Sequence, residues 1–363
     1  MDSLTQIVLG AAVGEATLGK KIGRKASLYG AVLGTLPDLD VLWVKNAVDS
    51  FTEHRSFTHS LIVLLLVSPL FALLLKRWHP FAKTISGKTI NESAIDKSPI
   101  SFQYYCFSVY LIFATHALID WFTVYGTQLL WPLTNYPFGL ASVFIVDPLY
   151  TLPLLLFLLV MIIWRKYKAL IVGIAVSCVY LTWSLVAQAT QANYFETALQ
   201  EKGINTQKSL TLPTPLNTLL WKNITMAENG YWVSFRSIFD DKDAPLQIQF
   251  FSSENDKIEQ IAETESVKRL QAFTKGFYQI RELDDGIWMS DLRMGGFGNF
   301  VFNFRVGERN QSQKIIQPEE VIVQSLRGDK EQIKGALDRM KQRVTSENIE
   351  LFDLFNNSRM VQK

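Results

Sequence analysis

The sequence predicts an α-helical membrane bundle of about five to six apolar helices, some of them short or re-entrant, followed by a soluble α+β domain. Of the 363 residues, 48% are hydrophobic, and the long apolar runs all come before residue 190. Up to residue 189 the chain has 14 Lys and Arg and 10 Asp and Glu, and the remainder has 22 and 24. We therefore expect a membrane-embedded domain at 1–190 and a separate domain at 191–363.

The apolar runs cover residues 4–19, 26–44, 61–75, 102–122, 144–164 and 169–189. A helix that crosses the hydrocarbon core of about 30 Å needs about 20 apolar residues. The run at 4–19 is shorter and rich in Gly and Ala, which favours a tightly packed or re-entrant helix. The acidic N-terminus is not typical of a cleavable signal peptide, so insertion has to come from the retained segments.

Basic residues are distributed unevenly between these runs. The segments at 20–25, 76–101 and 165–168 hold twelve Lys and Arg, and those at 45–60 and 121–143 hold two. Cytoplasmic loops are enriched in Lys and Arg. We therefore expect a multi-pass protein of the cell inner (plasma) membrane, with the two poorly charged segments and the C-terminal domain on the extracytoplasmic side.

The C-terminal part has the pattern of a soluble domain. Alternating segments with aromatic and β-branched residues predict strands at 231–235, 246–251, 286–289 and 299–306. Spaced apolar positions predict helices at 254–275 and 328–344, and two prolines predict a linker at 211–215.

Composition also excludes several classes of protein. The net charge is +2, so no nucleic-acid partner is expected. The two cysteines, Cys106 and Cys178, both lie in apolar runs, which excludes a disulfide framework and a zinc site built on cysteine.

Metal-binding side chains are sparse in the apolar half and lie at the ends of its segments. Of four histidines, His79 lies in a basic loop and is given no role, whereas His116 precedes Asp120 by four residues. On a helix this spacing puts both side chains on one face, where they can bind one ion at about 2.0–2.2 Å. The alternative is a helix-end histidine hydrogen-bonded to a carboxylate, but an aspartate inside a membrane segment is costly and favours function.

His54 and His59 flank Arg55 in the stretch 54–59. They converge if His54 lies in a loop and His59 on the first turn of the following helix. Arg55 has the side chain suited to bind a phosphate or carboxylate through two hydrogen bonds. The alternative is an interfacial loop with an anchoring arginine.

Asp38 and Asp40 follow Pro37. In an irregular turn these carboxylates can reach one centre and bridge two ions; the alternative is a pair of solvated acids that end a helix. Secondary candidates for the site are Asp2, Gln6, Glu15 and Asp147. For Asp147, which precedes a proline, a role as helix N-cap is favoured.

Several motifs together resemble those of a bacterial membrane-bound metal-dependent hydrolase family, described as LexA-binding, inner-membrane-associated hydrolases. The resemblance covers about residues 1–190. The motifs are Asp2-Ser3-Leu4-Thr5-Gln6, Gly34-Thr35-Leu36-Pro37-Asp38-Leu39-Asp40, His54-Arg55-Ser56-Phe57-Thr58-His59-Ser60, Thr115-His116-Ala117-Leu118-Ile119-Asp120, Tyr125-Gly126-Thr127-Gln128-Leu129-Leu130-Trp131-Pro132 and Val146-Asp147-Pro148-Leu149-Tyr150.

This family is remotely similar to zinc-dependent phospholipase C and P1-type nucleases. The resemblance implies one or two divalent ions, zinc first, held by Asp38, His54, His59, His116 and Asp120. We expect a hydrolase that attacks a phosphoester or ester of a membrane lipid or envelope precursor. Asp38 or Asp40 would act as bridging ligand or general base, and Arg55 would neutralise a phosphoryl group. The alternative is a non-catalytic membrane protein with a structural or transported metal and a partner-binding outer domain.

Overall fold

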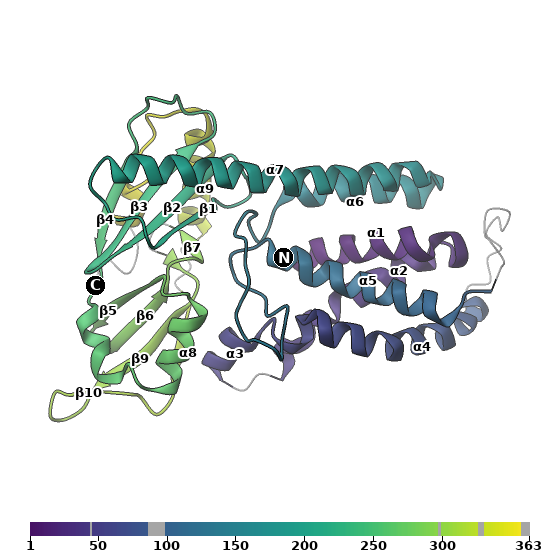
Figure 1. Cartoon of the computed structure of the whole chain (residues 1–363), viewed down its shortest axis with the longest axis horizontal. Helices are drawn as coiled ribbons and strands as arrows, with labels where there is room; N and C mark the ends of the chain where they lie inside the picture. Colours follow the sequence, from purple (N-terminus) through teal and green to yellow (C-terminus); the bar gives the residue numbers. More distant parts are fainter. Residues whose placement is uncertain (44–45, 86–98, 297–298, 326–329, 357–363) are drawn as a thin grey trace. The chain divides into compact units, whose positions relative to one another are not determined.

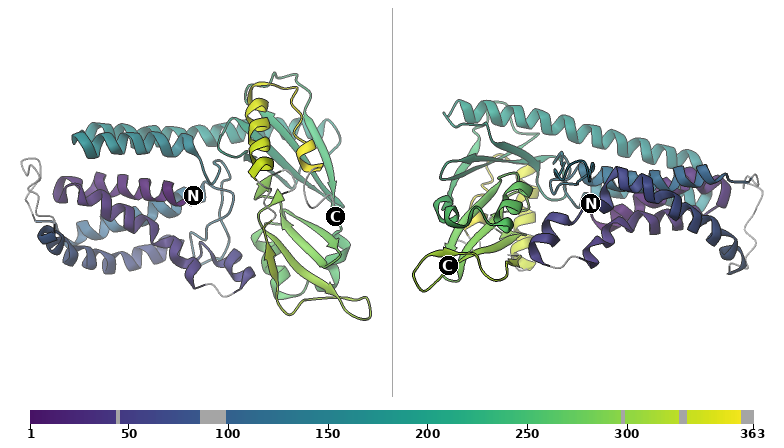
Figure 2. Two further views of the ribbon diagram at one scale, coloured as in Figure 1. Left: turned by 180° about the vertical axis from the view of Figure 1, so that it is seen from behind. Right: turned by 60° about the horizontal axis from the view of Figure 1, so that its bottom comes forward.

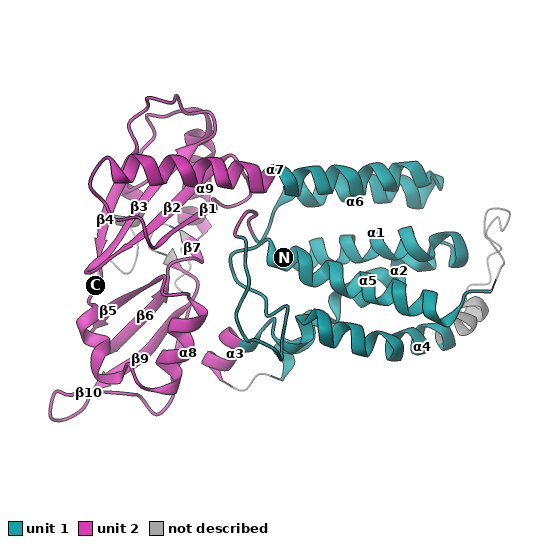
Figure 3. Ribbon diagram, in the orientation of Figure 1, with its two compact units in different colours: residues 1–44, 53–140, 145–183 teal, residues 45–52, 141–144, 184–363 magenta. Residues whose placement is uncertain are grey.

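The computed structural model describes residues 1–43, 46–85, 99–296, 299–325 and 330–356, and Figure 1 shows the chain in sequence colours. The chain forms two compact units (Figure 3). The first contains Met1–Val44, Glu53–Leu140 and Ile145–Trp183, and the second contains Lys45–Thr52, Ala141–Phe144 and Ser184–Lys363.

The first unit is helical. Its helices are α1 (Ser3–Ile22), α2 (Lys25–Thr35), η1 (Pro37–Leu42), η2 (Phe57–His59), α4 (Leu61–Ile85), α5 (Phe102–Trp121), α6 (Pro148–Trp164) and the first part of α7 (Tyr167–Gln200). Asp2 begins α1 because its carboxylate accepts hydrogen bonds from the backbone N–H groups of Leu4 and Thr5. Residues 86–98, part of the predicted loop 76–101, lie outside the described residues.

Helices α1 and α2 are antiparallel neighbours and pack through glycines. A Cβ atom at Gly14 would lie 2.8 Å from Gly30 Cα, and one at Gly34 would lie 3.0 Å from Gly10 Cα. Real side chains do not tolerate such distances to backbone, so the glycines permit a closer approach than larger residues would. The small residues of the first apolar run therefore serve helix packing, as expected.

The core of the first unit is formed by residues of α1, α2, α4 and α5. Leu64, Ala72, Ile112 and Phe113 are among its buried residues. In contrast, many large apolar side chains on α4, α6 and α7 are exposed, including Leu66 at 73% and Val179 at 68%. Extended apolar surfaces of this kind mark contact with lipid or with another protein.

The described residues contain fewer candidate spans than the sequence predicted. Two helices, α5 and α7, are long and apolar enough to cross a membrane, and there are three candidates if the bent pair Ala47–His59 and Leu61–Arg77 counts as one span. The expected helical N-terminal region is therefore confirmed, but it has fewer candidate spans than the five to six apolar helices that were expected. Helix α2 has 11 residues and α6 has 17, so the 1.5 Å rise per residue leaves both short of the hydrocarbon thickness.

The second unit contains antiparallel sheets, seen from two further directions in Figure 2. The first sheet has the order β1-β2-β3-β4, from Ser209–Pro213, Leu220–Ala227, Gly230–Ser237 and Gln247–Ser252. The second has the order β10-β9-β6-β5, with β11 also paired to β9, from Ile315–Ile316, Asn303–Arg309, Gly286–Asp291, Tyr278–Leu283 and Ile322–Gln324. A short pair joins β7 (Gly295–Gly296) to β8 (Asn299–Phe300).

The strands predicted at 231–235, 246–251 and 286–289 correspond to β3, β4 and β6. The predicted linker at 211–215 was wrong, because most of it is strand β1, and the predicted strand 299–306 is divided between β8 and β9. The remaining helices of this unit are η4 (Asn255–Ile261), α8 (Glu265–Phe273), α9 (Lys330–Thr345) and α10 (Asp353–Asn356).

Helix α3 (Ala47–Glu53) comes from the N-terminal half of the chain but packs almost entirely within the second unit. The ring of Phe51 is 1% exposed and has its centroid 4.7 Å from that of Phe273 and 5.0 Å from that of Phe304. Asp49 forms an ion pair of 2.6 Å with Arg269. Sequence reasoning placed these residues in an exposed loop, because the partners of this short helix lie more than 200 residues away.

Candidate metal centre

Four of the predicted site residues meet in the first unit. One ligand atom from each of Asp38, His59, His116 and Asp120 lies within 4.8 Å of the others, which makes the group a candidate metal site. His116 and Asp120 come from the last turns of α5, as their spacing predicted. Asp38 comes from η1 and His59 from η2, two short helices that flank the segment 46–56.

Hydrogen bonds outside the cluster determine which nitrogen of each imidazole carries hydrogen. His116 Nδ1 lies 2.6 Å from the carbonyl oxygen of Gly34, which can only accept, so Nδ1 donates, and in the neutral ring Nε2 has a lone pair. The Thr58 hydroxyl donates to Asp40 Oδ2 at 2.8 Å. That hydroxyl therefore accepts from His59 Nδ1, 3.0 Å away, and Nε2 of His59 also has a lone pair.

The two Nε2 atoms lie 3.0 Å apart. Asp120 Oδ2 is 3.3 Å from His59 Nε2 and 3.4 Å from His116 Nε2, and Asp38 Oδ1 is 3.4 and 3.5 Å from the same atoms. Asp38 Oδ1 and Asp120 Oδ2 are buried and have no hydrogen-bond partner among the described residues. With both imidazoles neutral and donating through Nδ1, four electron-rich atoms converge, which fits a divalent cation with nitrogen and oxygen ligands.

The other oxygen of Asp120 contacts a guanidinium and an amino group. Arg55 Nη2 lies 3.2 Å from Asp120 Oδ1, and the buried amino group of Met1 contacts the same oxygen. Arg55 also donates to the Thr123 hydroxyl at 3.2 Å and stacks over the ring of Tyr125. Because Arg55 is only 3% exposed, its charge is directed at Asp120 and orients that carboxylate.

Asp40 and His54 lie beside the cluster of four and not within it. Asp40 accepts hydrogen bonds from His54 Nδ1 at 2.8 Å, from the backbone N–H of Arg55 at 3.0 Å and from Thr58. Burial raises the pKa of Asp40, but the bonds from His54 and Arg55 outweigh burial and hold this pKa below its usual value. His54 was expected to be a ligand, but in the structure its Nδ1 binds Asp40. Asp40 in turn orients His59 through the Thr58 hydroxyl.

The cluster is closed on most sides. His59, His116 and Asp120 are at most 1% exposed, whereas the side chain of Asp38 is 26% exposed. Access to solvent or substrate is therefore on the side of Asp38.

The secondary candidates have separate surroundings. Asp2 and Asp147 are helix N-caps, and Asp147 also accepts from Tyr180 at 2.7 Å. Glu15 pairs with Arg165 and accepts from a serine of α2, so it belongs to helix packing. Gln6 is 1% exposed, and neither polar atom of its side chain has a hydrogen-bond partner among the described residues. The side chain of His79 lies outside the described residues.

Sequence reasoning missed three groups that set the geometry of the site: the Thr58 hydroxyl, the Gly34 carbonyl and the Thr123 hydroxyl. Thr58 is adjacent to His59 in the sequence, so a hydrogen bond between the two side chains could have been predicted. The other two contacts join residues 82 and 68 positions apart, and no local pattern points to them.

The fold and the site define a membrane-associated helical protein with a candidate metal centre of Asp and His side chains. The chain belongs to the YdjM inner membrane protein family, whose model matches residues 1–191. It is 30% identical over 156 residues to the uncharacterized protein YfhP of Bacillus subtilis (strain 168), an alignment that covers 41% of this chain and 42% of the relative. The match thus spans less than half the length of that relative. No solved structure gives a significant match.

The inner-membrane family expected from the motifs is therefore confirmed over residues 1–191. The likeness to zinc-dependent phospholipase C and P1-type nucleases stays a prediction, as do the multi-pass topology and the extracytoplasmic position of the C-terminal domain.

Proposed function

We propose that the protein is a membrane-bound metal-dependent hydrolase that cleaves a phosphoester or ester of a lipid or envelope substrate at the extracytoplasmic face. The observation that carries this proposal is the convergence of two imidazole Nε2 atoms and two carboxylate oxygens at one place. The donor set is two nitrogens and two oxygens, which suits zinc. A bound zinc ion would lower the pKa of a water molecule to about 7 and supply a nucleophile for hydrolysis.

The residues around the cluster suggest a division of roles. Asp38 is the one partly exposed member, so it is the candidate for bridging ligand or general base. Asp40 is 3% exposed and accepts three hydrogen bonds, which suits it to orient His59 and His54. Arg55 is a positioning residue in this proposal, because its guanidinium forms an ion pair with Asp120.

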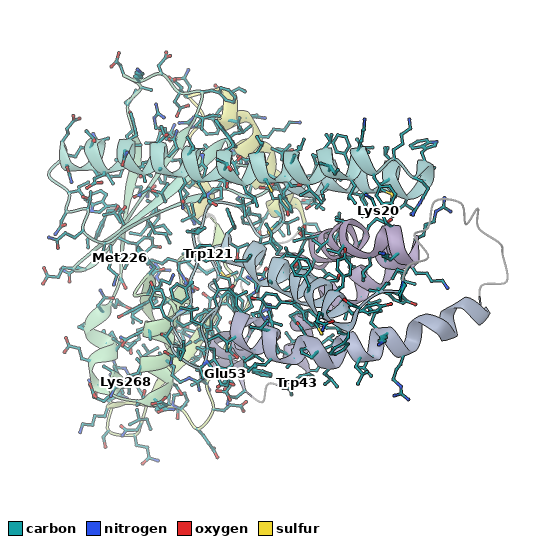
Figure 4. All side chains as sticks on the ribbon, turned by 45° about the vertical axis from the view of Figure 1, so that its right-hand side comes forward. Lys20, Trp43, Glu53, Trp121, Met226 and Lys268 are labelled. Carbon is teal, nitrogen blue, oxygen red and sulfur yellow. The ribbon has the colours of Figure 1, made fainter. Side chains whose placement is uncertain are left out.

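The place of the site in the helical unit supports a substrate at the membrane surface. Trp121, next to Asp120, and Lys20 lie at opposite ends of this unit (Figure 4). The basic cluster of residues 20–25 is thus at one end and the candidate metal centre at the other. Since basic residues mark the cytoplasmic side, we place the site near the outer headgroups, where lipid phosphoesters are available.

The first test is the metal content of the full chain purified in detergent, with His59→Ala and His116→Ala beside the unmodified protein. We expect at least one equivalent of a divalent ion in the unmodified protein and its loss from both variants. The unmodified protein should hydrolyse a chromogenic phosphodiester or the phospholipids of mixed vesicles in a manner that EDTA abolishes and zinc restores, and both histidine variants should lack this activity.

Thr115→Val is the matched control. Thr115 precedes His116 on the same helix, and its hydroxyl bonds to the carbonyl oxygens of Leu111 and Ile112 on its own helix. The control should retain both metal and activity. Unmodified protein that contains no metal after exposure to zinc, or histidine variants that keep it, would end the proposal.

A structural metal is the second candidate, favoured by a specific observation. Four protein ligands with three of them fully buried are typical of structural zinc, whereas catalytic sites keep one position for water. Asp38→Asn separates the two functions. A catalytic base at this position predicts retained metal and hydrolysis lowered by about 10²–10⁴-fold. A structural site predicts weaker metal binding and a lower unfolding temperature, with no hydrolysis in any variant.

A further inference from the structure

We infer that the side-chain carbonyl of Gln6 faces the candidate metal centre and supplies a fifth, neutral oxygen to the ion bound there. This inference rests on the metal site of the proposed function and adds a residue that lies outside the cluster of four. It is carried by two independent observations: the register between α1 and α2, and a buried side-chain amide that has no hydrogen-bond partner among the described residues.

The packing of α1 against α2 determines where Gln6 lies. Gly14 is next to Gly30 and Gly10 is next to Gly34. A step of four residues toward the N-terminus of α1 therefore corresponds to a step of four residues toward the C-terminus of α2. The next step pairs Gln6 with position 38. Consistent with this register, a Cβ atom at Gly34 would lie 2.9 Å from the backbone carbonyl oxygen of Gln6. The continuation of α2 beyond Gly34 leads directly to Asp38 in η1.

The side chain of Gln6 shares the face of α1 that carries the two glycines. Residues four apart on a helix project from the same side, and Gln6, Gly10 and Gly14 follow that spacing. The same face therefore turns toward α2 and, at its end, toward Asp38. The opposite side of the cluster is also close, because the amino group of Met1 contacts Asp120 and the backbone N–H of Gln6 donates to the backbone carbonyl oxygen of Asp2, one turn earlier in the chain.

The amide of Gln6 is buried without a hydrogen bond. Its side chain is 1% exposed, and both Oε1 and Nε2 lack partners among the described residues. A buried amide without partners is costly, so such a group calls for an explanation. Elsewhere on α1 the buried polar side chains are satisfied: Thr5 bonds to Asp2 and Thr151, and Glu15 pairs with Arg165. The lack of a partner is therefore specific to Gln6.

A metal ion accounts for this amide. Its carbonyl oxygen is a neutral donor of the kind that divalent cations accept beside carboxylates and imidazoles. Two carboxylates already supply negative charge in the cluster. A neutral fifth donor raises the coordination number without adding further repulsion between anions.

The test measures metal binding to the full chain in detergent for the unmodified protein, Gln6→Leu and Gln6→Glu. Zinc affinity is obtained by competition with a chelating dye, and the visible absorption of the cobalt-substituted protein reports the ligand set. We expect Gln6→Leu to lower zinc affinity by about 10–100-fold and to change the cobalt spectrum. Gln6→Glu keeps an oxygen at this position and should bind at least as tightly as the unmodified protein.

Thr5→Val is the matched control, because Thr5 is the buried neighbour of Gln6 with partners away from the cluster. Its zinc affinity and cobalt spectrum should equal those of the unmodified protein. The unfolding temperature of the metal-free Gln6→Leu protein should be no lower than that of the metal-free unmodified protein, since leucine removes an unsatisfied polar group. Equal affinity and equal spectra for Gln6→Leu and the unmodified protein would overturn this inference alone, whereas no metal in the unmodified protein would overturn the proposed function with it.

Discussion

Nε2 of His116 lies 3.0 Å from Nε2 of His59, and each ring has its Nδ1 hydrogen bonded to a different partner. Two imidazole lone pairs at this distance repel one another unless a cation or a shared proton lies near both. The carboxylate oxygens of Asp38 and Asp120 point at the same place, which favours the cation. The site thus depends as much on the outer hydrogen bonds as on the four inner side chains.

The first prediction concerns Thr58. Thr58→Val keeps the shape of the side chain and removes the hydroxyl that joins Asp40 to His59 Nδ1. The imidazole then loses the partner that holds its tautomer, so zinc affinity should fall by about 10–100-fold. Dye competition measures the change. Thr58→Ser retains the hydroxyl and should bind zinc as the unmodified protein does; equal affinity in the valine variant would show that the hydroxyl does not orient His59.

The second prediction concerns Arg55. Arg55→Met leaves Asp120 Oδ1 without its guanidinium partner in a buried position. Loss of one partner of a buried ion pair costs about 3–5 kcal/mol, so the free energy of unfolding should fall by that order. Denaturant titration in detergent gives the value. Arg165→Met is a useful comparison, because that arginine pairs with Glu15, is 25% exposed and should cost less.

The third prediction concerns helix packing in the first unit. Gly30→Ala would place a Cβ atom 3.0 Å from Gly14 Cα and closer still to the backbone of Gly10. Backbone atoms cannot move aside as a side chain can, so α1 and α2 must separate. We expect a loss of about 1–3 kcal/mol, as for other overpacked positions. Thermal unfolding measures it, and weaker zinc binding should accompany it because Gly34 and Asp38 move with α2.

Gly335→Ala serves as the control for that experiment. Gly335 lies within α9 of the second unit, and a Cβ atom there would meet nothing within 4 Å. Alanine is favoured over glycine in a helix by about 0.5–1 kcal/mol, so this variant should be as stable as the unmodified protein or more so. A similar loss in both variants would contradict the packing argument.

The fourth prediction concerns Lys222 in strand β2 of the second unit. Burial lowers the pKa of Lys222 to about 8 from its usual value of 10.5, while Asp291 acts in the opposite direction. Between these two pH values the unfolded chain binds more protons than the folded chain at this residue. Stability should therefore rise as the pH increases from about 8 to about 10.5, by roughly 3 kcal/mol from this group.

Lys222→Met removes the titrating group from that position. The variant should be more stable than the unmodified protein at pH 7, and the difference should diminish by pH 10. Trp221 is fully buried beside Lys222, so tryptophan fluorescence during denaturant titration can follow the transition. A difference that does not change with pH would show that Lys222 does not titrate in this range.

Local patterns predicted much of the site. The spacing of four between His116 and Asp120 placed both on one helical face, whereas the resemblance to a hydrolase family implied that Asp38 and His59 join them. The position of His54 was predicted less well, because a spacing of five leaves its direction to the loop. In the structure Arg55 has a φ of 65°, and its backbone and His54 both turn to Asp40.

The amino-acid sequence by itself determined the division into an apolar N-terminal half and a polar C-terminal half, the family, and the residue types able to hold a metal ion. Hydropathy, periodicity and motif spacing are local properties and can be read without a fold. Only the tertiary structure decided which carboxylate enters the cluster, which tautomer each histidine adopts and that α3 packs into the C-terminal unit. Those features depend on contacts between residues far apart in the chain, and their geometry arises only when the glycine-lined helices and the sheets are packed.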